Sequence, residues 1–70
     1  MRAMIYVNGE PTELRPGAKL AQALALLSLS VEARGIAVAI DGEVLPRERW
    51  EQTALDDGAR VEVVAAIQGG

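Results

Sequence analysis

The most apolar strand-like segment of the 70-residue sequence comes last, at residues 60–66, and this constrains the fold more than any other feature. A strand rich in Val and Ala is expected at the centre of a sheet, with a neighbouring strand on each side. A chain of this length can bury only one small core. The earlier segments must therefore be arranged around the last strand.

Two pairs of short extended segments are each separated by a turn-forming dipeptide, Asn8-Gly9 in the first pair and Asp41-Gly42 in the second. Such dipeptides between extended segments are a strong hairpin signal. We therefore predict two antiparallel hairpins. Their strands are expected at residues 3–7, 10–14, 36–40 and 43–45, and Pro46 ends the last of them.

One segment of real length, residues 19–27, has a helical period instead. Its apolar residues follow the i, i+3, i+4, i+7 spacing of a single helix face: Leu20, Ala23, Leu24 and Leu27. Ala18 is a poor N-cap, so the Pro16-Gly17 turn must redirect the chain. We also expect Leu29 and Val31 to fold under the helix end. A helical turn at residues 47–50 is expected to bring Trp50 over the end of the core, with its charged residues facing water.

The order of these elements is strand, strand, helix, strand, strand, strand. With the last strand central, it runs parallel beside the first, and the two hairpins lie outside this pair. This arrangement is a β-grasp, the fold of ubiquitin. We predict an α+β domain over residues 1–66, with a mixed sheet of four to five strands and one main helix packed on one face, followed by a flexible Gly-Gly tail at residues 67–70.

Strand alternation predicts which side chains occupy the sheet face that the helix leaves open. If Val61 and Val63 point to the helix, Glu62 and a set of apolar, mostly small residues share the other face. Such a face beside a flexible terminus is typical of a surface on which a larger partner docks. The predicted partner-docking residues are Met4, Tyr6, Ala37, Ala39, Val64 and Ala66.

The composition argues against several classes of function. The sequence has no cysteine and no histidine, so it offers no thiol nucleophile, no thiolate metal site and no imidazole base. Its net charge of −3 disfavours nucleic-acid binding. Asp56 and Asp57 are adjacent but lack a visible third ligand, so no metal site is predicted. The apolar stretches are too short to span a bilayer and the start lacks a signal-peptide pattern, which favours a cytoplasmic protein without a membrane partner.

The sequence resembles the ThiS-type sulfur carriers of thiamine biosynthesis over essentially its whole length. The resemblance lies in residues 6–10, residues 37–47, Trp50, Asp57-Gly58 and the terminal Gln68-Gly69-Gly70. Three departures affect helix and turn positions: Ala18-Lys19 where a threonine often caps the helix, Ser28 in place of a common glycine, and Asp41 in place of a common asparagine. None of these departures lies in the tail.

The resemblance implies a carrier and not an enzyme, with no catalytic residue and no bound cofactor. In similar proteins a ThiF-type adenylating enzyme uses ATP and Mg²⁺ to activate the last glycine, here Gly70. A cysteine desulfurase or another persulfide donor then supplies sulfur, and the resulting thiocarboxylate serves a ThiG-type thiazole synthase. Gly69 is expected to give the tail a thin passage. Gln68 and Ile67 are expected to position it in both partner sites.

Other functions of the same fold remain open from the sequence. The chain could carry sulfur for molybdopterin synthesis or for tRNA thiolation, or it could modify proteins as ubiquitin does. A pure binding module for RNA or a regulatory partner is a further alternative. That alternative predicts unchanged activity after removal of Gly69-Gly70.

Overall fold

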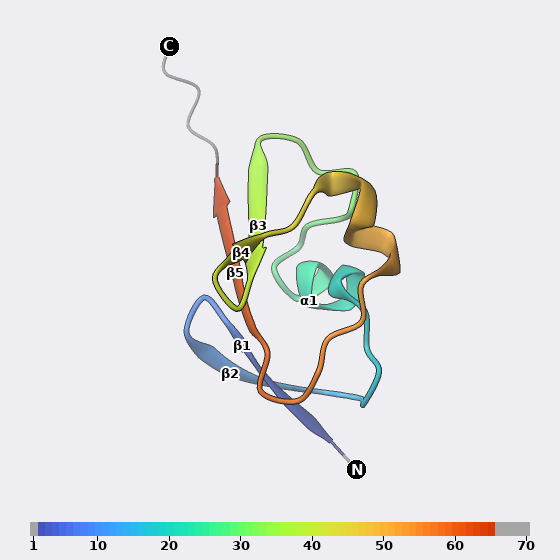
Figure 1. Cartoon of the computed structure of the whole chain (residues 1–70), viewed down its shortest axis with the longest axis vertical. Coiled ribbons are helices and arrows are strands. Elements are labelled where there is room, and N and C mark those ends of the chain that lie inside the picture. Colours follow the sequence, from blue (N-terminus) through green and yellow to red (C-terminus); the bar gives the residue numbers. More distant parts are fainter. Residues whose placement is uncertain (1, 66–70) are drawn as a thin grey trace.

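A computed structural model describes residues 2–65 of the chain (Figure 1). Its elements are β1 (Ala3–Val7), β2 (Glu10–Leu14), α1 (Leu20–Leu26), β3 (Ile36–Ile40), β4 (Glu43–Val44), the 3₁₀ helix η1 (Arg47–Gln52) and β5 (Arg60–Ala65). All the predicted elements are present. The helix is one residue shorter at each end than predicted, and β4 stops one residue earlier.

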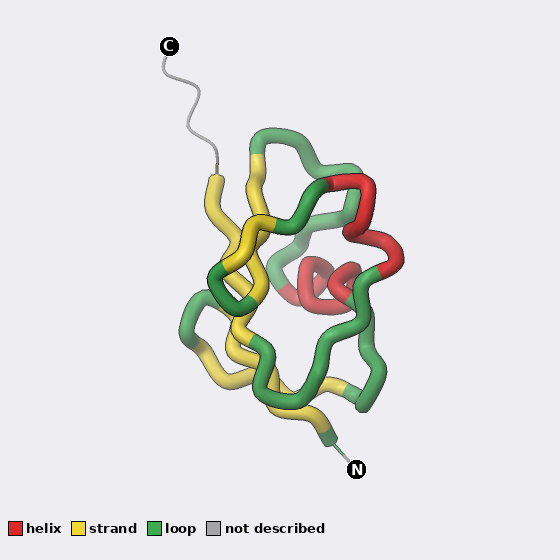
Figure 2. The backbone as a smooth tube through the Cα atoms, viewed as in Figure 1, coloured by secondary structure: helices red, strands yellow, loops and turns green. Residues whose placement is uncertain are grey.

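The five strands form one mixed sheet in the order β2-β1-β5-β3-β4. The last strand of the chain is central, parallel to β1 and antiparallel to β3. Figure 2 shows the strands gathered on one side of the molecule, with the helical segments on the other. The predicted β-grasp topology is therefore confirmed.

The core lies between the sheet and the helical layer. The alternation predicted for β1 is observed, because Ala3, Ile5 and Val7 are all buried. The buried core residues are Ala3, Ile5, Val7, Leu20, Ala23, Leu24, Val38, Trp50, Leu55, Ala59 and Val61. Among residues 2–65, no helix is long and apolar enough to cross a bilayer.

The start of α1 differs from the prediction, which took Ala18 as the N-cap. The N-cap is Lys19, whose backbone N–H donates to the Gln22 side-chain oxygen at 2.7 Å. This bond satisfies one backbone donor in the manner of half a capping box. Ala18 is instead buried, and its carbonyl accepts a hydrogen bond from the Leu55 N–H at 2.8 Å.

The end of α1 corrects a second expectation, that Leu27 belongs to the buried helix face. Leu27 is the C-cap and is 39% exposed. Ser28 follows with φ at +62°, and the N–H groups of Ser28 and Leu29 bond back to Ala25 and Leu24. These two bonds form a Schellman motif, which reverses the chain direction. Leu29 packs against the core after this reversal, as predicted, together with Val31.

Arg47 and Trp50 form a structural unit at the start of η1. The indole N–H of Trp50 donates to the Leu45 carbonyl at 2.9 Å, and the Arg47 guanidinium lies 4.2 Å from the centre of the Trp50 ring. Arg47 also donates to the Val31 carbonyl at 2.9 Å. Arg47 is thus more than a solvated charge, because it ties the segment after α1 to η1.

We expect Arg47→Ala to lower the free energy of unfolding by about 1–2 kcal/mol, because it removes both the ring contact and the bond to Val31. Arg47→Lys keeps the charge but lacks the planar guanidinium, so an intermediate loss is expected. Urea unfolding followed by circular dichroism measures both. Arg49→Ala in the same 3₁₀ helix is the control and should leave the midpoint nearly unchanged. An equal loss in the two alanine variants would contradict the role assigned to Arg47.

Candidate functional site

The predicted site has two parts, the tail and the open sheet face. Ala66, Ile67, Gln68, Gly69 and Gly70 lie outside the described residues, so the roles assigned to them stay predictions. The structure does describe the strand that leads to them, which is β5 as far as Ala65.

The face of the sheet opposite the core carries the other five predicted docking residues. Their positions follow from the register: Ala37 is paired with Val64, Ala39 with Glu62 and also with Val44, and Tyr6 with Arg60. Val64 is 61% exposed. Val44 is 77% exposed and also belongs to this face, although the sequence analysis did not include it. The two-residue turn after Ile40 fixes this pairing and could have identified Val44.

The register places these residues at different positions along the sheet. Ala37 and Val64 are paired near the end of β5 from which the chain continues toward the tail, and Ala39 and Val44 are paired beside them at the level of Glu62; we call these four residues the tail-side patch. Met4 lies elsewhere, because β1 and β5 are parallel and Met4 precedes by two residues the Tyr6 that is paired with Arg60. Along the direction of β5, Met4 thus lies at a level about six residues before Val64. At the rise per residue of a strand, this separates Met4 from Val64 by about 20 Å.

Charged residues lie on this face between the level of Met4 and the level of Val64. The sequence pattern predicts Glu62 as the exception on an otherwise apolar face, but Arg60 is also exposed on this face, whereas the adjacent Val61 is buried on the other face. A hollow of about 620 Å³ lies here, lined by Tyr6, Gly9, Asp41, Gly42, Arg60, Val61 and Glu62. The open face is therefore apolar at Ala37 and Val64 near the tail, and farther from the tail it carries Glu62 beside Ala39 and Arg60 beside Tyr6. Only the tail-side patch has the apolar character that was predicted for the whole surface.

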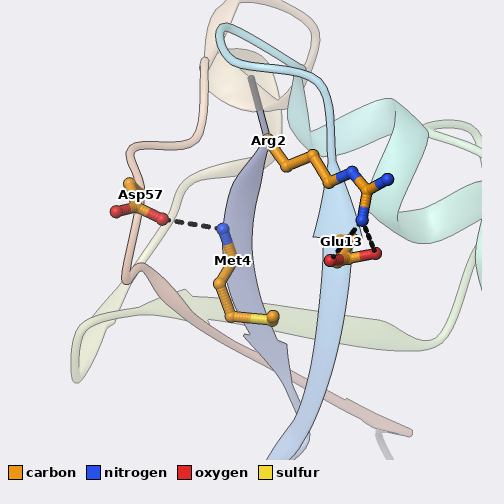
Figure 3. Close-up of polar contacts among 4 residues, drawn as sticks. All are labelled: Arg2, Met4, Glu13 and Asp57. Atoms are coloured by element: carbon orange, nitrogen blue, oxygen red, sulfur yellow. Dashed lines mark hydrogen bonds and ion pairs between the residues drawn. The ribbon is translucent and has the colours of Figure 1, made fainter.

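The loop before β5 is fixed to the start of β1 (Figure 3). The Met4 N–H donates to the Asp57 carboxylate at 2.7 Å, and the Gly58 N–H donates to the Met4 carbonyl at 2.7 Å. Figure 3 also shows the exposed pair of Arg2 and Glu13, 3.1 Å apart, which joins β2 to the segment before β1. Exposed pairs of this kind contribute little to stability. The hydrogen bond from Met4 gives the Asp57 carboxylate a structural use. Within residues 2–65, no group of three or more potential metal-ligating side chains occurs.

Comparison with known proteins identifies the family. The model of the ThiS family matches residues 5–70. The chain belongs to the ThiS family. The sulfur carrier protein ThiS of Thermus thermophilus is 39% identical over 67 residues, which cover 96% of this chain and 100% of that protein. The resemblance predicted from the sequence is thus confirmed.

Two further kinds of relative extend this finding. A thiazole synthase of Paramagnetospirillum magneticum is 35% identical over 66 residues, which are 94% of this chain but 20% of that protein. A crystal structure of ThiS from Geobacter metallireducens has a TM-score of 0.78 at 30% identity and covers 96% of this chain and 99% of its own. The solution structure of a thiamine biosynthesis protein from the same organism has a TM-score of 0.71 at 30% identity, with 96% and 87% covered. These solved ThiS structures share the β-grasp fold.

Proposed function

We propose that this chain is a sulfur carrier of thiamine biosynthesis that holds sulfur as a thiocarboxylate on Gly70. The observation that carries the proposal is the match to the ThiS family through residue 70. The alignment of a sulfur carrier from Thermus thermophilus over its full length supports it. In this role the chain is a co-substrate of its partner enzymes and supplies no catalytic group.

The chemistry follows from the groups that the chain has. Since the sequence has no cysteine, the terminal carboxylate is the group on which this protein would carry sulfur. A carboxylate is a poor acyl electrophile and must be activated. A Gly70 carboxylate oxygen attacks the α-phosphorus of ATP, and Mg²⁺-bound pyrophosphate leaves. Hydrosulfide then attacks the acyl carbon and AMP leaves. With a persulfide donor, a thiol must also cleave the S–S bond of the acyl disulfide before the thiocarboxylate is free.

Two partner enzymes are part of the proposal, a ThiF-type adenylating enzyme and a ThiG-type thiazole synthase. The second is supported by the thiazole synthase of Paramagnetospirillum magneticum, because a segment that makes up 20% of that protein is similar to 94% of this chain. One polypeptide with both segments is a natural arrangement for a carrier and the enzyme that uses its sulfur. The tail-side patch is the surface on which we expect both enzymes to dock, because it adjoins the strand that leads to the tail.

The test is the transfer of sulfur to the purified chain. After incubation with the adenylating enzyme, ATP, Mg²⁺ and sodium sulfide, intact-mass spectrometry should detect the exchange of one oxygen for one sulfur. We expect a variant with one alanine added after Gly70 to gain no sulfur, because the added side chain and the displaced carboxylate no longer reach the reacting phosphorus.

The control carries the added alanine at the amino terminus and should be loaded normally. Thermal unfolding should be the same for both variants. Sulfur on the carboxyl-terminally extended variant would exclude Gly70 as the acceptor, and no sulfur on the unmodified chain would contradict the carrier function itself.

A further inference from the structure

The central strand β5 is paired over a longer stretch with β3 than with β1. Toward β3 the pairing runs over five residues, from Val61 with Ile40 to Ala65 with Ile36. Toward β1 it covers only two, and it ends where Val7 is paired with Val61. Beyond Val61 the backbone of β1 turns away into the hairpin. The backbone groups of Val63 would therefore lack a partner on this side.

The side chain of Asn8 provides that partner. The Asn8 backbone N–H donates to the Val61 carbonyl at 2.8 Å. Its side-chain oxygen accepts a hydrogen bond from the Val63 N–H at 2.8 Å, and its side-chain NH₂ donates to the Val63 carbonyl at 3.3 Å. The amide thus takes the place of a peptide group and continues the β1–β5 ladder past the end of β1.

The residue type matches this arrangement. Asn8 has φ at +50°, a region that asparagine tolerates better than most residues other than glycine. An amide side chain carries both a donor and an acceptor, as the two groups of Val63 require. On the other side of β5, Asp41 has φ at +52° and accepts one bond from the Arg60 N–H at 3.0 Å. At position 41 a carboxylate is sufficient because only an acceptor is used. At position 8 an amide is needed because one bond is accepted and one is donated.

We propose that Asn8 is a positioning residue that fixes the direction in which β5 delivers the tail to a partner enzyme; this rests on the proposed function. Within residues 2–65, Val63 is the last residue of β5 that is bonded on the β1 side, and Val64 of the tail-side patch follows it directly. Without Asn8, the end of β5 would be held by β3 alone and could twist about that single edge. The docked carrier would then present its carboxylate at a wrong angle.

Two substitutions and one control test this role. Asn8→Gly keeps the positive φ available but removes both side-chain bonds. Asn8→Asp keeps the acceptor for the Val63 N–H and loses the donor to the Val63 carbonyl. The control is Asp57→Ala, which removes the side-chain bond between Met4 of β1 and the loop before β5, at the end of β5 far from the tail.

Sulfur loading is measured at a temperature at which every variant is folded. For Asn8→Gly we expect kcat to fall about ten- to a hundredfold with KM unchanged, because a small misplacement of reacting atoms has effects of this size. Asn8→Asp should lose less. Asp57→Ala should keep the kcat of the unmodified chain, although its melting temperature falls at least as far as that of Asn8→Gly.

A second measurement does not depend on sulfur transfer. Residual dipolar couplings of the Val64 and Ala65 N–H groups should change in Asn8→Gly and stay constant in Asp57→Ala. Unchanged couplings in Asn8→Gly, an unchanged kcat, or an equal loss of kcat in Asp57→Ala would each overturn the positioning role. If the unmodified chain takes up no sulfur, the carrier function fails, and the couplings alone decide whether Asn8 fixes the direction of β5: a change upholds that part of the proposal and no change overturns it.

Discussion

Trp50→Ala is expected to lower the free energy of unfolding by about 3–5 kcal/mol, the usual loss when a large buried aromatic residue is truncated. Trp50 is 2% exposed and is among the largest fully buried side chains of the core. A domain of this size has a total stability of about 4–10 kcal/mol. The substitution should therefore remove about a third or more of that stability, and at the lower end of this range it should leave a substantial unfolded fraction in water.

The control for this prediction is Trp50→Phe, which keeps a ring under Arg47 but removes the indole N–H. The Leu45 carbonyl then loses its side-chain donor, and we expect a loss of about 1–2 kcal/mol. Urea unfolding followed by far-ultraviolet circular dichroism compares the three proteins, since the alanine and phenylalanine variants lack the single tryptophan. A midpoint for Trp50→Ala close to that of Trp50→Phe would show that the core can close over the missing ring.

The strands and their order could be predicted from the sequence because local and global signals agree. The turns at Asn8-Gly9 and Asp41-Gly42 mark the two hairpins, and the apolar residues of the last strand require a central place. The hairpin signal depends on a few neighbouring residues, and the central place of the last strand depends on the single small core. Few other topologies would satisfy both in a chain of this length.

What the sequence analysis missed depends on details that lie between elements. Leu27 fits the helical period, yet the chain reverses at Ser28 and Leu29 packs against the core. Arg47 reads as a surface charge until the Trp50 ring and the Val31 carbonyl are placed beside it. The reversal at Ser28 is set by its backbone angles, and the bond of Arg47 to Val31 joins segments distant in the chain, so neither follows from residue spacing.

The candidate docking face was predicted in part for a similar reason. Alternation along a strand gives the side of the sheet but not the position along it. Met4 and Val64 share a face, yet the parallel register of β1 and β5 places them at different ends. The same register places Arg60 and Glu62 between Met4 and Val64 on that face. The sequence pattern thus predicted which side chains share the open face of the sheet, whereas the pairing of strands is needed to locate the tail-side patch; docking on this face stays a prediction.

Val64→Glu is expected to reduce kcat/KM for sulfur loading by about 30-fold or more. The reason is that docking on the tail-side patch would bury an unpaired carboxylate, at a cost of about 2 kcal/mol or more. Val64 is 61% exposed before docking, so the fold itself should tolerate the change with little loss of stability. The effect should appear mainly in KM, because the introduced carboxylate would weaken docking without changing the tail.

Leu26→Glu is the matched control. Leu26 ends α1 in the helical layer, which covers the opposite face of the sheet, and at 58% it is nearly as exposed as Val64. The two variants therefore introduce the same charge at apolar sites of similar exposure, and they differ in whether the site belongs to the tail-side patch. Loading kinetics and calorimetric titration with the adenylating enzyme should give a weak complex for Val64→Glu and an unaltered one for Leu26→Glu. Equal kinetics in both variants would place the docking surface elsewhere on the molecule, because a carboxylate in the centre of an apolar interface cannot be accommodated without a measurable loss of affinity.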